Sequence, residues 1–159
     1  MSAKELCFFV PSDRPGKPWY GLNDIIAATR LSGSRHPDWQ KLKAEKHAAK
    51  YAWEAKAAQG WDAPEGRCEV VLTFVEVGRS RDPDNIFGGA KYIMDALCTP
   101  LFHHRDKKGK EVWRHLNGCG AIKDDSQRYV SLRCAIAERT DRQNPGVWVR
   151  IREMGGTDE

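Results

Sequence analysis

The chain has 159 residues, of which 30% are charged and 40% hydrophobic, and its formal net charge is +4. A chain of this length forms one hydrophobic core, so we expect a single domain over residues 1–159. The composition excludes a disordered protein, and no apolar run is long enough to span a membrane. The N-terminal apolar stretch is too short for a signal peptide, which predicts a cytoplasmic protein without membrane contact.

The first half of the chain predicts a strand, a helix and a second strand. The apolar run 5–10, ELCFFV, ends at a proline and indicates a strand. The prolines and glycines of residues 11–24 favour a loop. Over residues 37–59 apolar side chains recur at helical spacing, and a glycine follows. Residues 68–77, CEVVLTFVEV, are rich in β-branched side chains and predict a strand.

The second half predicts a helix followed by four strands. Residues 86–97 place apolar side chains on one helical face. Residues 101–116 contain two short strands around a Lys-Gly turn, which is the pattern of a β-hairpin. Alternating runs at 128–138 and 146–154 predict the last two strands, and residues 155–159 a mobile tail. This order predicts a small α+β domain in which two main helices pack on a mixed β-sheet.

Five cysteines are scattered along the chain without a CxxC pair. An odd number in this arrangement indicates reduced thiols, which is typical of a cytosolic protein. We expect most of them to be small core residues. They are Cys7, Cys68, Cys98, Cys119 and Cys134.

Two aspartates flank a proline in the segment RSRDPDNIFGGAKYIMDAL, residues 79–97. Pro83 favours an extended conformation for the residue before it, and in an extended segment residues i and i+2 point to the same side. Asp82 and Asp84 would then face one point. Because two like charges need a cation, a proton or open water, the pair suits a hard divalent ion such as Mg²⁺. Asn85 could cap the following helix or add a neutral oxygen ligand.

A second acidic pair, Asp124 and Asp125, lies downstream, directly before a predicted strand. In an extended segment these two side chains point to opposite sides of the chain. We therefore expect only one of them to join the first acidic pair at a single metal site.

Lys91 and Asp95 are spaced i, i+4 on the predicted helix and are close enough to pair. A lysine beside a metal site can offset charge that develops on a phosphate. Each of these signals also has a purely structural interpretation, because DPDN and DDSQ are common turn sequences and an i, i+4 pair is often a surface contact. The conjunction of the motifs is what favours a catalytic site.

The ordered motifs together resemble those of the RusA family of Holliday junction resolvases. They are Arg81-Asp82-Pro83-Asp84-Asn85, then Lys91, then Asp95-Ala96-Leu97, then Asp124-Asp125. Members of this family are small dimeric, Mg²⁺-dependent endodeoxyribonucleases of bacteria and prophages that act in DNA recombination and repair. The resemblance implies a RusA-like fold and a homodimer that resolves a four-way DNA junction by paired phosphodiester hydrolysis. It further implies that Asp82, Asp84 and Asp125 are catalytic carboxylates that bind one or two Mg²⁺ ions, and that Lys91 is the catalytic lysine.

The chain departs from the family pattern at two places. About three extra residues, near Phe87-Gly88-Gly89, separate Asn85 from Lys91, and within a helix they would rotate the lysine by roughly 300°. We expect the glycines to absorb this length in a loop, since glycine tolerates irregular backbone. The second departure is a longer segment at 99–120, which we interpret as an inserted hairpin.

The inserted segment is basic and carries several potential metal ligands. Residues 101–134 hold eight Lys or Arg against four Asp or Glu. We expect cations here and beside the acidic motif to contact DNA phosphates, and a solvated surface without a ligand is the alternative. The candidates for DNA contact are Arg79, Arg81, Lys107, Lys108, Lys110 and Lys123. Cys98, His103, His115 and Cys119 could form a zinc clip, but their order is not a standard zinc pattern, so we do not expect zinc in the insertion.

Tryptophans divide into two groups by their position in the pattern. Trp19, with Tyr20, lies in the Pro/Gly-rich loop and is a candidate for stacking on DNA bases. Helix or strand patterns predict burial for four others. These are Trp39, Trp53, Trp113 and Trp148.

Two alternatives to junction resolution stay open. The same metal site could act on flaps, forks or other branched nucleic acids. The chain could instead be a non-catalytic DNA-binding module in which the aspartates only shape a loop. The presence of every acidic position of the motif favours an enzyme.

Overall fold

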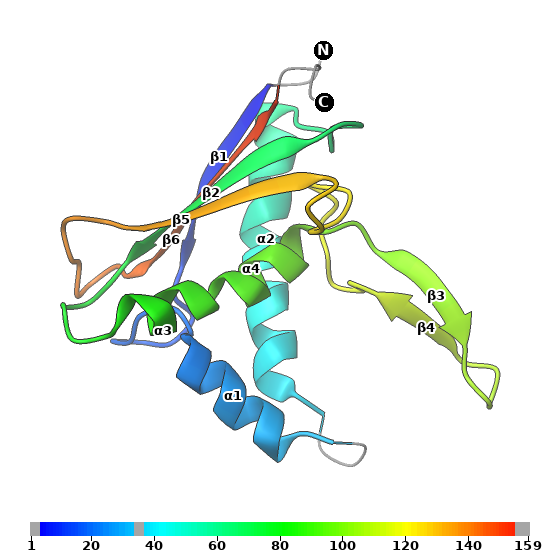
Figure 1. Cartoon of the computed structure of the whole chain (residues 1–159), viewed down its shortest axis with the longest axis horizontal. Coiled ribbons are helices and arrows are strands. Elements are labelled where there is room, and N and C mark those ends of the chain that lie inside the picture. Colours follow the sequence, from blue (N-terminus) through cyan, green and yellow to red (C-terminus); the bar gives the residue numbers. More distant parts are fainter. Residues whose placement is uncertain (1–3, 34–36, 155–159) are drawn as a thin grey trace.

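A four-stranded mixed sheet forms the centre of the structure (Figure 1), a computed structural model that describes residues 4–33 and 37–154. Its order is β1-β6-β2-β5; β6 is antiparallel to both of its neighbours, and β5 is parallel to β2. The predicted α+β class and mixed sheet are confirmed, and β1 and β5 are the edge strands. The strands are β1 (Glu5–Pro11), β2 (Cys68–Val75), β5 (Val130–Ile136) and β6 (Gly146–Glu153).

One face of the sheet carries the core, because side chains alternate between the two faces along each strand. On β2, for example, Val70, Leu72 and Phe74 are fully buried, and the residues between and before them, Glu69, Val71 and Thr73, are partly exposed. The helix α2 (Trp39–Gln59) contacts both β1 and α4, and the buried positions along it are alanines apart from Glu45. Small side chains allow this helix to approach closely, and its two tryptophans are placed on the outside.

A rod of two helical segments, α3 (Pro83–Gly88) and α4 (Ala90–Leu97), runs beside β5 (Figure 1). The prediction that glycines would form a loop here is wrong, since Gly89 keeps right-handed helical angles (φ −67°, ψ −9°) between the segments. Gly88 and Gly89 allow the rod to pack closely against the backbone at the start of α1. A Cβ at Gly88 would lie 2.5 Å from the Cβ of Leu22, and one at Gly89 would overlap the carbonyl oxygen of Tyr20.

The helix α1 (Leu22–Leu31) was not predicted, because the prolines and glycines before it favoured a loop. Trp19 and Tyr20, just ahead of it, are 0% and 2% exposed, and the Trp19 indole donates a hydrogen bond to the Gly89 carbonyl at 3.0 Å. The prediction that these two residues stack on DNA bases is therefore wrong. They anchor the N-terminal loop on the α3–α4 rod.

The four tryptophans predicted to be buried are instead substantially exposed. Their exposed fractions range from 41% at Trp113 to 69% at Trp39, with Trp53 and Trp148 between. Helical or strand periodicity identified the right elements but assigned the wrong face. On α2 the alanine row, and not the tryptophan row, meets the core.

The predicted hairpin is confirmed as β3 (Leu101–Arg105) and β4 (Glu111–Arg114), which project away from the body of the domain (Figure 1). Gly109 has a φ of 79° in the connecting turn, a left-handed value that favours glycine. Phe102 and Trp113 face each other across the strands with ring centroids 5.7 Å apart. Both rings are more than 40% exposed, so the hairpin has no core of its own.

The five cysteines are free thiols, and Cys68, Cys98 and Cys119 are buried as predicted. Within the described ranges, no helix combines the length and apolarity needed to cross a membrane. The predicted mobile tail, 155–159, lies outside the described residues.

Candidate functional site

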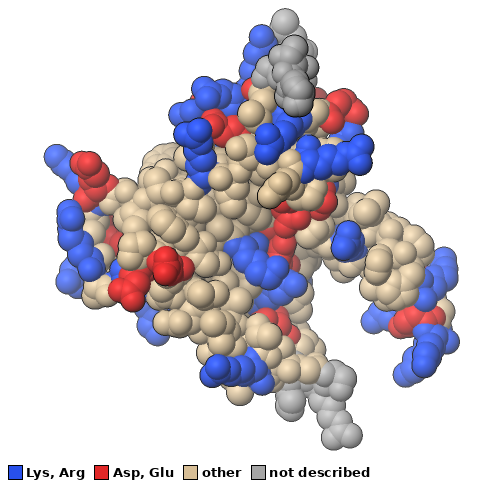
Figure 2. All heavy atoms as spheres, in the orientation of Figure 1, with Lys and Arg blue, Asp and Glu red and all other residues tan. Residues whose placement is uncertain are grey.

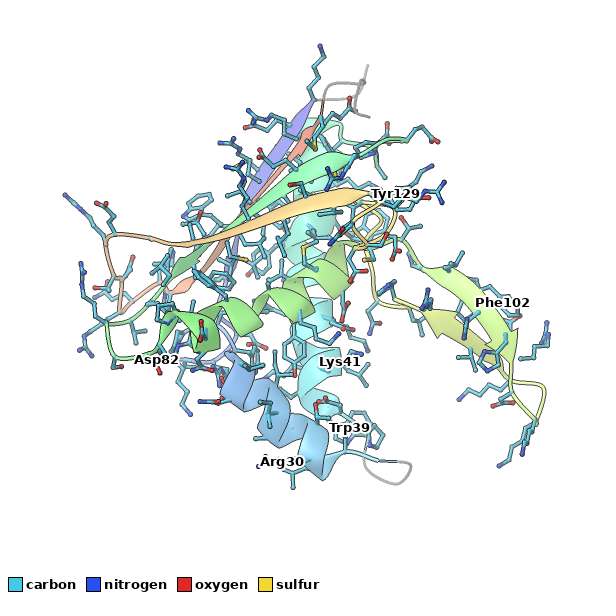
Figure 3. The ribbon with its side chains drawn as sticks, in the orientation of Figure 1. Arg30, Trp39, Lys41, Asp82, Phe102 and Tyr129 are labelled. Atoms are coloured by element: carbon cyan, nitrogen blue, oxygen red, sulfur yellow. The ribbon has the colours of Figure 1, made fainter. Side chains whose placement is uncertain are left out.

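The acidic residues predicted to form one metal site lie at opposite ends of the α3–α4 rod. Asp82 immediately precedes α3 (Figure 3), and the backbone before Asp124 is tied to the end of α4 by a hydrogen bond from Ile122 N–H to the Leu97 carbonyl at 3.0 Å. A rod of roughly 15 residues is about 22 Å long. Among the described residues, neither Asp82 nor Asp84 joins Asp125 in a group with metal-ligand spacing. One chain therefore does not assemble the predicted three-aspartate site.

The N-terminal end of the rod presents two exposed carboxylates. Asp82 is extended (φ −70°, ψ 145°), as Pro83 predicted, but α3 begins at Pro83, so Asp84 already lies in the first helical turn. The expectation that both side chains project from an extended segment is thus wrong. Asp82 makes no capping hydrogen bond with its side chain, which leaves its carboxylate available to a ligand.

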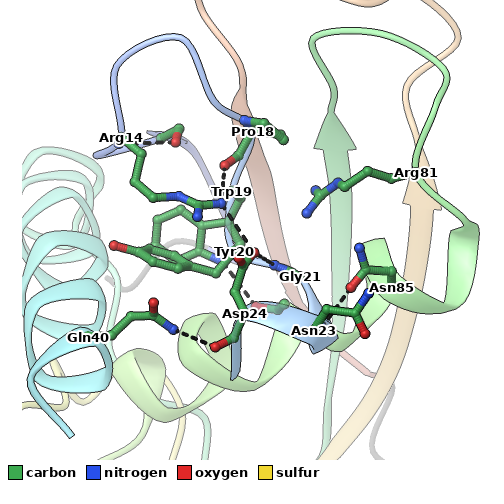
Figure 4. Close-up of polar contacts among 12 residues, drawn as sticks. Arg14, Pro18, Trp19, Tyr20, Gly21, Asn23, Asp24, Gln40, Arg81 and Asn85 are labelled. Carbon is green, nitrogen blue, oxygen red and sulfur yellow. Dashed lines mark hydrogen bonds and ion pairs between the residues drawn. The ribbon is translucent and has the colours of Figure 1, made fainter. Parts of the chain in front are cut away.

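Asn85 has a different role from either of those predicted. Its side-chain oxygen accepts a hydrogen bond from the backbone N–H of Asn23 at 2.8 Å (Figure 4). This bond satisfies one of the free donors in the first turn of α1, since the first N–H groups of a helix have no partner within it. Asn85 therefore joins α1 to α3.

Arg81 is held by a buried acid. Its guanidinium donates to both oxygens of Glu76, at 2.8 and 2.7 Å, and Glu76 is 3% exposed. Arg81 was predicted to contact DNA or to be a solvated arginine. Its charge is instead neutralised by this ion pair. Arg79 is exposed and donates one hydrogen bond to the Glu138 carbonyl, so it is the freer cation at this end.

The C-terminal end of the rod gathers a thiol, an imidazole and two carboxylates. Cys98, His115, Asp124 and Asp125 each offer a ligand atom, and these atoms all lie within 4.8 Å of one another. The expectation that Asp124 and Asp125 point to opposite sides of an extended segment is wrong, because residues 121–129 form bends and turns. The backbone of His115 is left-handed, with a φ of 51°.

His115 lies between two carboxylates that come from different elements. Its Nδ1 is 3.7 Å from an oxygen of Asp95 on α4, and its Nε2 is 3.5 Å from an oxygen of Asp124. These distances are too long for strong hydrogen bonds but short enough for charge attraction when the imidazole is protonated. The imidazole thus bridges the hairpin root, the helix end and the loop before β5.

A buried pair of acids, Glu45 on α2 and Asp95 on α4, lies behind His115, and each residue is 6% exposed. Burial raises the pKa of Glu45 to about 7, against the opposing charge of Lys41, and the adjacent carboxyl of Asp95 raises it further. Sequence reasoning missed Glu45. The available signal was a single acid within the alanine-lined face of α2.

Lys91, near the middle of the rod, is connected to this end through Asp95. Its Nζ is 3.6 Å from an oxygen of Asp95, and its side chain is 60% exposed. The predicted i, i+4 pair is confirmed. Over the residues that the structure describes, no ion pair links Lys91 to Asp82 or Asp84.

Cys98 is fully buried, and its Sγ lies 3.2 Å from the carbonyl oxygen of Met94. Burial raises the pKa of this thiol, and the nearby charge of Asp125 raises it further. Of the clip of Cys98, His103, His115 and Cys119, only Cys98 and His115 belong to the ligand group. His103 lies on the exposed hairpin, and the Cys119 thiol faces the Leu97 carbonyl.

The predicted hairpin cations Lys107, Lys108 and Lys110 are exposed, and Figure 2 shows basic side chains grouped at the far end of the projecting hairpin. Asp106 orders this turn by accepting hydrogen bonds from the backbone N–H groups of Lys108 and Lys110, both at 2.9 Å. Lys123 is paired with the exposed carboxylate of Glu65 at 2.7 Å. The turn lysines are therefore the better placed of these cations for a phosphate backbone.

Comparisons of the chain with protein-family models, with curated proteins and with solved structures found no match.

Proposed function

We propose that the protein is a Mg²⁺-dependent endonuclease of branched DNA, most specifically a Holliday junction resolvase of the kind that its motifs resemble. The observation that carries this proposal is the pair Asp82 and Asp84, which are both exposed at the start of α3, and Asp82 makes no capping hydrogen bond with its side chain. Exposed carboxylates of this kind suit Mg²⁺, which prefers oxygen ligands and retains several waters. A nuclease acting on cellular DNA would work in the cytoplasm.

The proposed site needs a second copy of the chain, because the acids lie at opposite ends of one rod. Asp125 precedes the start of β5, and a pocket lined by Pro83, Ile86 and Ile136 places the start of α3 beside the other end of that strand. A two-fold axis across β5 would bring the beginning of one strand near the end of the other. Asp82 and Asp84 of one subunit would then meet Asp125 of the partner subunit.

The edge strand β5 has the surface that such a dimer requires. Leu132 and Ile136 pair with the core residues Val70 and Phe74 and so point to the core side of the sheet, yet they are 44% and 37% exposed, since no further strand of the described residues covers this edge. An unpaired edge with partly exposed apolar residues is a natural surface for strand pairing. Pairing two such edges would bury these side chains and create two equivalent sites, as two symmetric nicks require.

In this arrangement one or two Mg²⁺ ions would activate a water molecule and stabilise the leaving oxygen of the phosphodiester. Lys91 lies on the exposed side of α4, and its ammonium group would offset phosphate charge near Asp95. The turn lysines of the hairpin would contact the backbone of a DNA arm.

The proposal is tested by cleavage of a synthetic four-way junction in Mg²⁺ with Asp82→Asn. We expect the variant to lose at least a hundredfold in rate while it keeps the melting temperature of the parent protein, since the side chain is exposed. Asp62→Asn, at another exposed aspartate, is the matched control and should cut normally. Parent-like cutting by Asp82→Asn would contradict the catalytic assignment.

The alternative functions separate in the same assay. Faster cutting of flaps or forks than of junctions would favour a broader branched-DNA nuclease. Junction binding in EDTA, with no cutting after Mg²⁺ is added, would favour a non-catalytic binding module.

A further inference from the structure

The ligand group at the root of the hairpin contains donor types that Mg²⁺ does not select. Cys98 supplies sulfur and His115 supplies nitrogen, and Asp124 and Asp125 supply oxygen. Magnesium is bound through oxygen, whereas a thiolate and an imidazole together favour Zn²⁺ and similar transition metals. The chemistry of this group therefore differs from that of the exposed acidic pair at Asp82.

The spacing of the four ligands is close to what one ion requires. In a tetrahedral zinc site, nitrogen and oxygen ligands lie about 2.0–2.1 Å from the metal and therefore about 3.3–3.4 Å from each other. His115 Nε2 and Asp124 Oδ1 are 3.5 Å apart, and the whole group falls within 4.8 Å. Only small movements of the side chains would be needed to close the group around an ion.

The surroundings of His115 match the usual support of a metal-bound histidine. Such a histidine directs its second ring nitrogen to a carboxylate or carbonyl, which fixes its orientation. Here Nε2 faces the ligand group, and Nδ1 faces Asp95 at 3.7 Å. Asp95 is buried and is itself held by Lys91 at 3.6 Å, so it can orient the ring without being a ligand.

We propose that Cys98, His115, Asp124 and Asp125 bind one transition-metal ion such as Zn²⁺, which ties the root of the β3–β4 hairpin to the end of α4. Cys98 precedes the inserted segment, His115 follows β4, and the two aspartates precede β5. A hairpin of two strands is marginally stable alone. The ion fixes its base and therefore the direction in which its basic tip projects.

This inference does not depend on the proposed nuclease activity, although Asp125 appears in both. Asp125 is the exposed member of the group, whereas Cys98 is fully buried and the side chains of His115 and Asp124 are 20% and 35% exposed. The three less exposed residues hold the ion at one position. Asp125 completes the coordination when its carboxylate is not bound to the Mg²⁺ of the proposed nuclease site.

The test is titration of metal-free protein with Co²⁺ in the absence of DNA. Cobalt replaces zinc in tetrahedral sites and gives a visible spectrum, with a near-ultraviolet charge-transfer band when a thiolate is a ligand. We expect one Co²⁺ per chain with that band, displaced by one Zn²⁺ and not by millimolar Mg²⁺. A saturating amount of Zn²⁺, about 100-fold above Kd, should raise the melting temperature by about 5–10 °C.

Matched variants assign the ligands. Cys98→Ala should abolish the charge-transfer band, whereas Cys119→Ala, at another buried cysteine outside the group, should retain it. Should Cys98→Ala fold poorly, His115→Asn serves instead, because asparagine tolerates the left-handed backbone at this position. It should weaken Co²⁺ binding at least tenfold.

Several outcomes would overturn the proposal: no stoichiometric Co²⁺, a spectrum without the thiolate band, or equal binding by Cys98→Ala. Because junction cleavage in Mg²⁺ is measured separately, failure of the zinc site and failure of the nuclease proposal are distinguishable.

Discussion

The two ends of the α3–α4 rod carry similar residue types in opposite environments. At the N-terminal end, Asp82 and Asp84 are exposed, and the adjacent cation Arg81 is neutralised by the buried Glu76. At the C-terminal end, His115 lies between the buried Asp95 and the partly exposed Asp124, beside the buried thiol of Cys98. At the N-terminal end the carboxylates are free to bind an external ligand. At the C-terminal end the side chains lie close to one another.

This difference shows why motif order alone does not define a site. The segment between the motifs leaves the end of α4, builds the hairpin and returns to the same end, where the Cys119 N–H donates to the Ala96 carbonyl at 2.8 Å. The downstream aspartates are therefore held near Asp95 and away from Asp82. Bringing all of the acids together requires a contact between two chains.

The largest expected effect comes from mixing two inactive variants, Asp84→Asn and Asp125→Asn. Each should lose at least a hundredfold in cleavage alone. If sites are shared between subunits, each mixed dimer has one intact site, so random exchange should restore about a quarter of the parent nicking rate. The measurement is nicking of a labelled junction after subunit exchange.

If each site instead lies within one chain, every site in the mixed dimer contains one substitution, and no activity returns. Mixing Asp84→Asn with Asp82→Asn is the control that should remain inactive in either case, since both changes lie at the same end of the rod.

The next effect tests the N-terminal end. Arg81→Ala leaves the carboxylate of Glu76 buried and unpaired, which should lower the free energy of unfolding by about 3 kcal/mol. Urea unfolding measures this change. Arg79→Ala removes only an exposed hydrogen bond and should cost less than about 0.5 kcal/mol. Equal effects of the two variants would show that the Arg81–Glu76 pair does not organise this end.

A smaller effect, dependent on pH, tests the C-terminal end. The pKa of Glu45 in the folded state, about 7, exceeds its ordinary value of 4.5, so the folded protein binds this proton more tightly than the unfolded chain. Stability from this group is then lost as pH rises from about 4.5 to about 7. The charges facing it are Asp95, which raises its pKa, and Lys41 and Lys91, which lower it.

Glu45→Gln removes this dependence. Relative to the parent protein, the variant should gain on the order of 2–3 kcal/mol in unfolding free energy between pH 5 and pH 8. Glu54→Gln, at an exposed position of the same helix, should show no such trend. Parallel pH profiles for Glu45→Gln and the parent would contradict the shifted pKa.

The smallest effect concerns DNA affinity at the hairpin. Replacing Lys107, Lys108 and Lys110 by alanine should weaken junction binding and reduce the slope of log K against log salt by up to about 2.7, at about 0.9 per phosphate contact. The melting temperature should not change, because the three side chains are exposed. A triple alanine control at Lys43, Lys46 and Lys50 of α2 should leave the slope unchanged.

The elements of the fold were largely predictable, whereas their faces and partners were not. Periodicity identified α2, but the alanine row is buried and Trp39 and Trp53 are exposed. Close packing of this helix favours small apolar side chains over large ones. The glycines after Phe87 suggested a loop, yet they continue the rod and admit the backbone of Tyr20. Both errors arose because the sequence pattern does not show which segments of the chain pack against each other.

The sequence by itself determined the α+β class, the hairpin, the extended residue before Pro83 and the Lys91–Asp95 pair, because each depends on local backbone preference or helical spacing. Only the tertiary structure decided that Asp82 and Asp125 lie at opposite ends of a rod. It also decided that Cys98, His115 and the downstream aspartates converge. These outcomes depend on contacts between segments far apart along the chain, which no local pattern encodes.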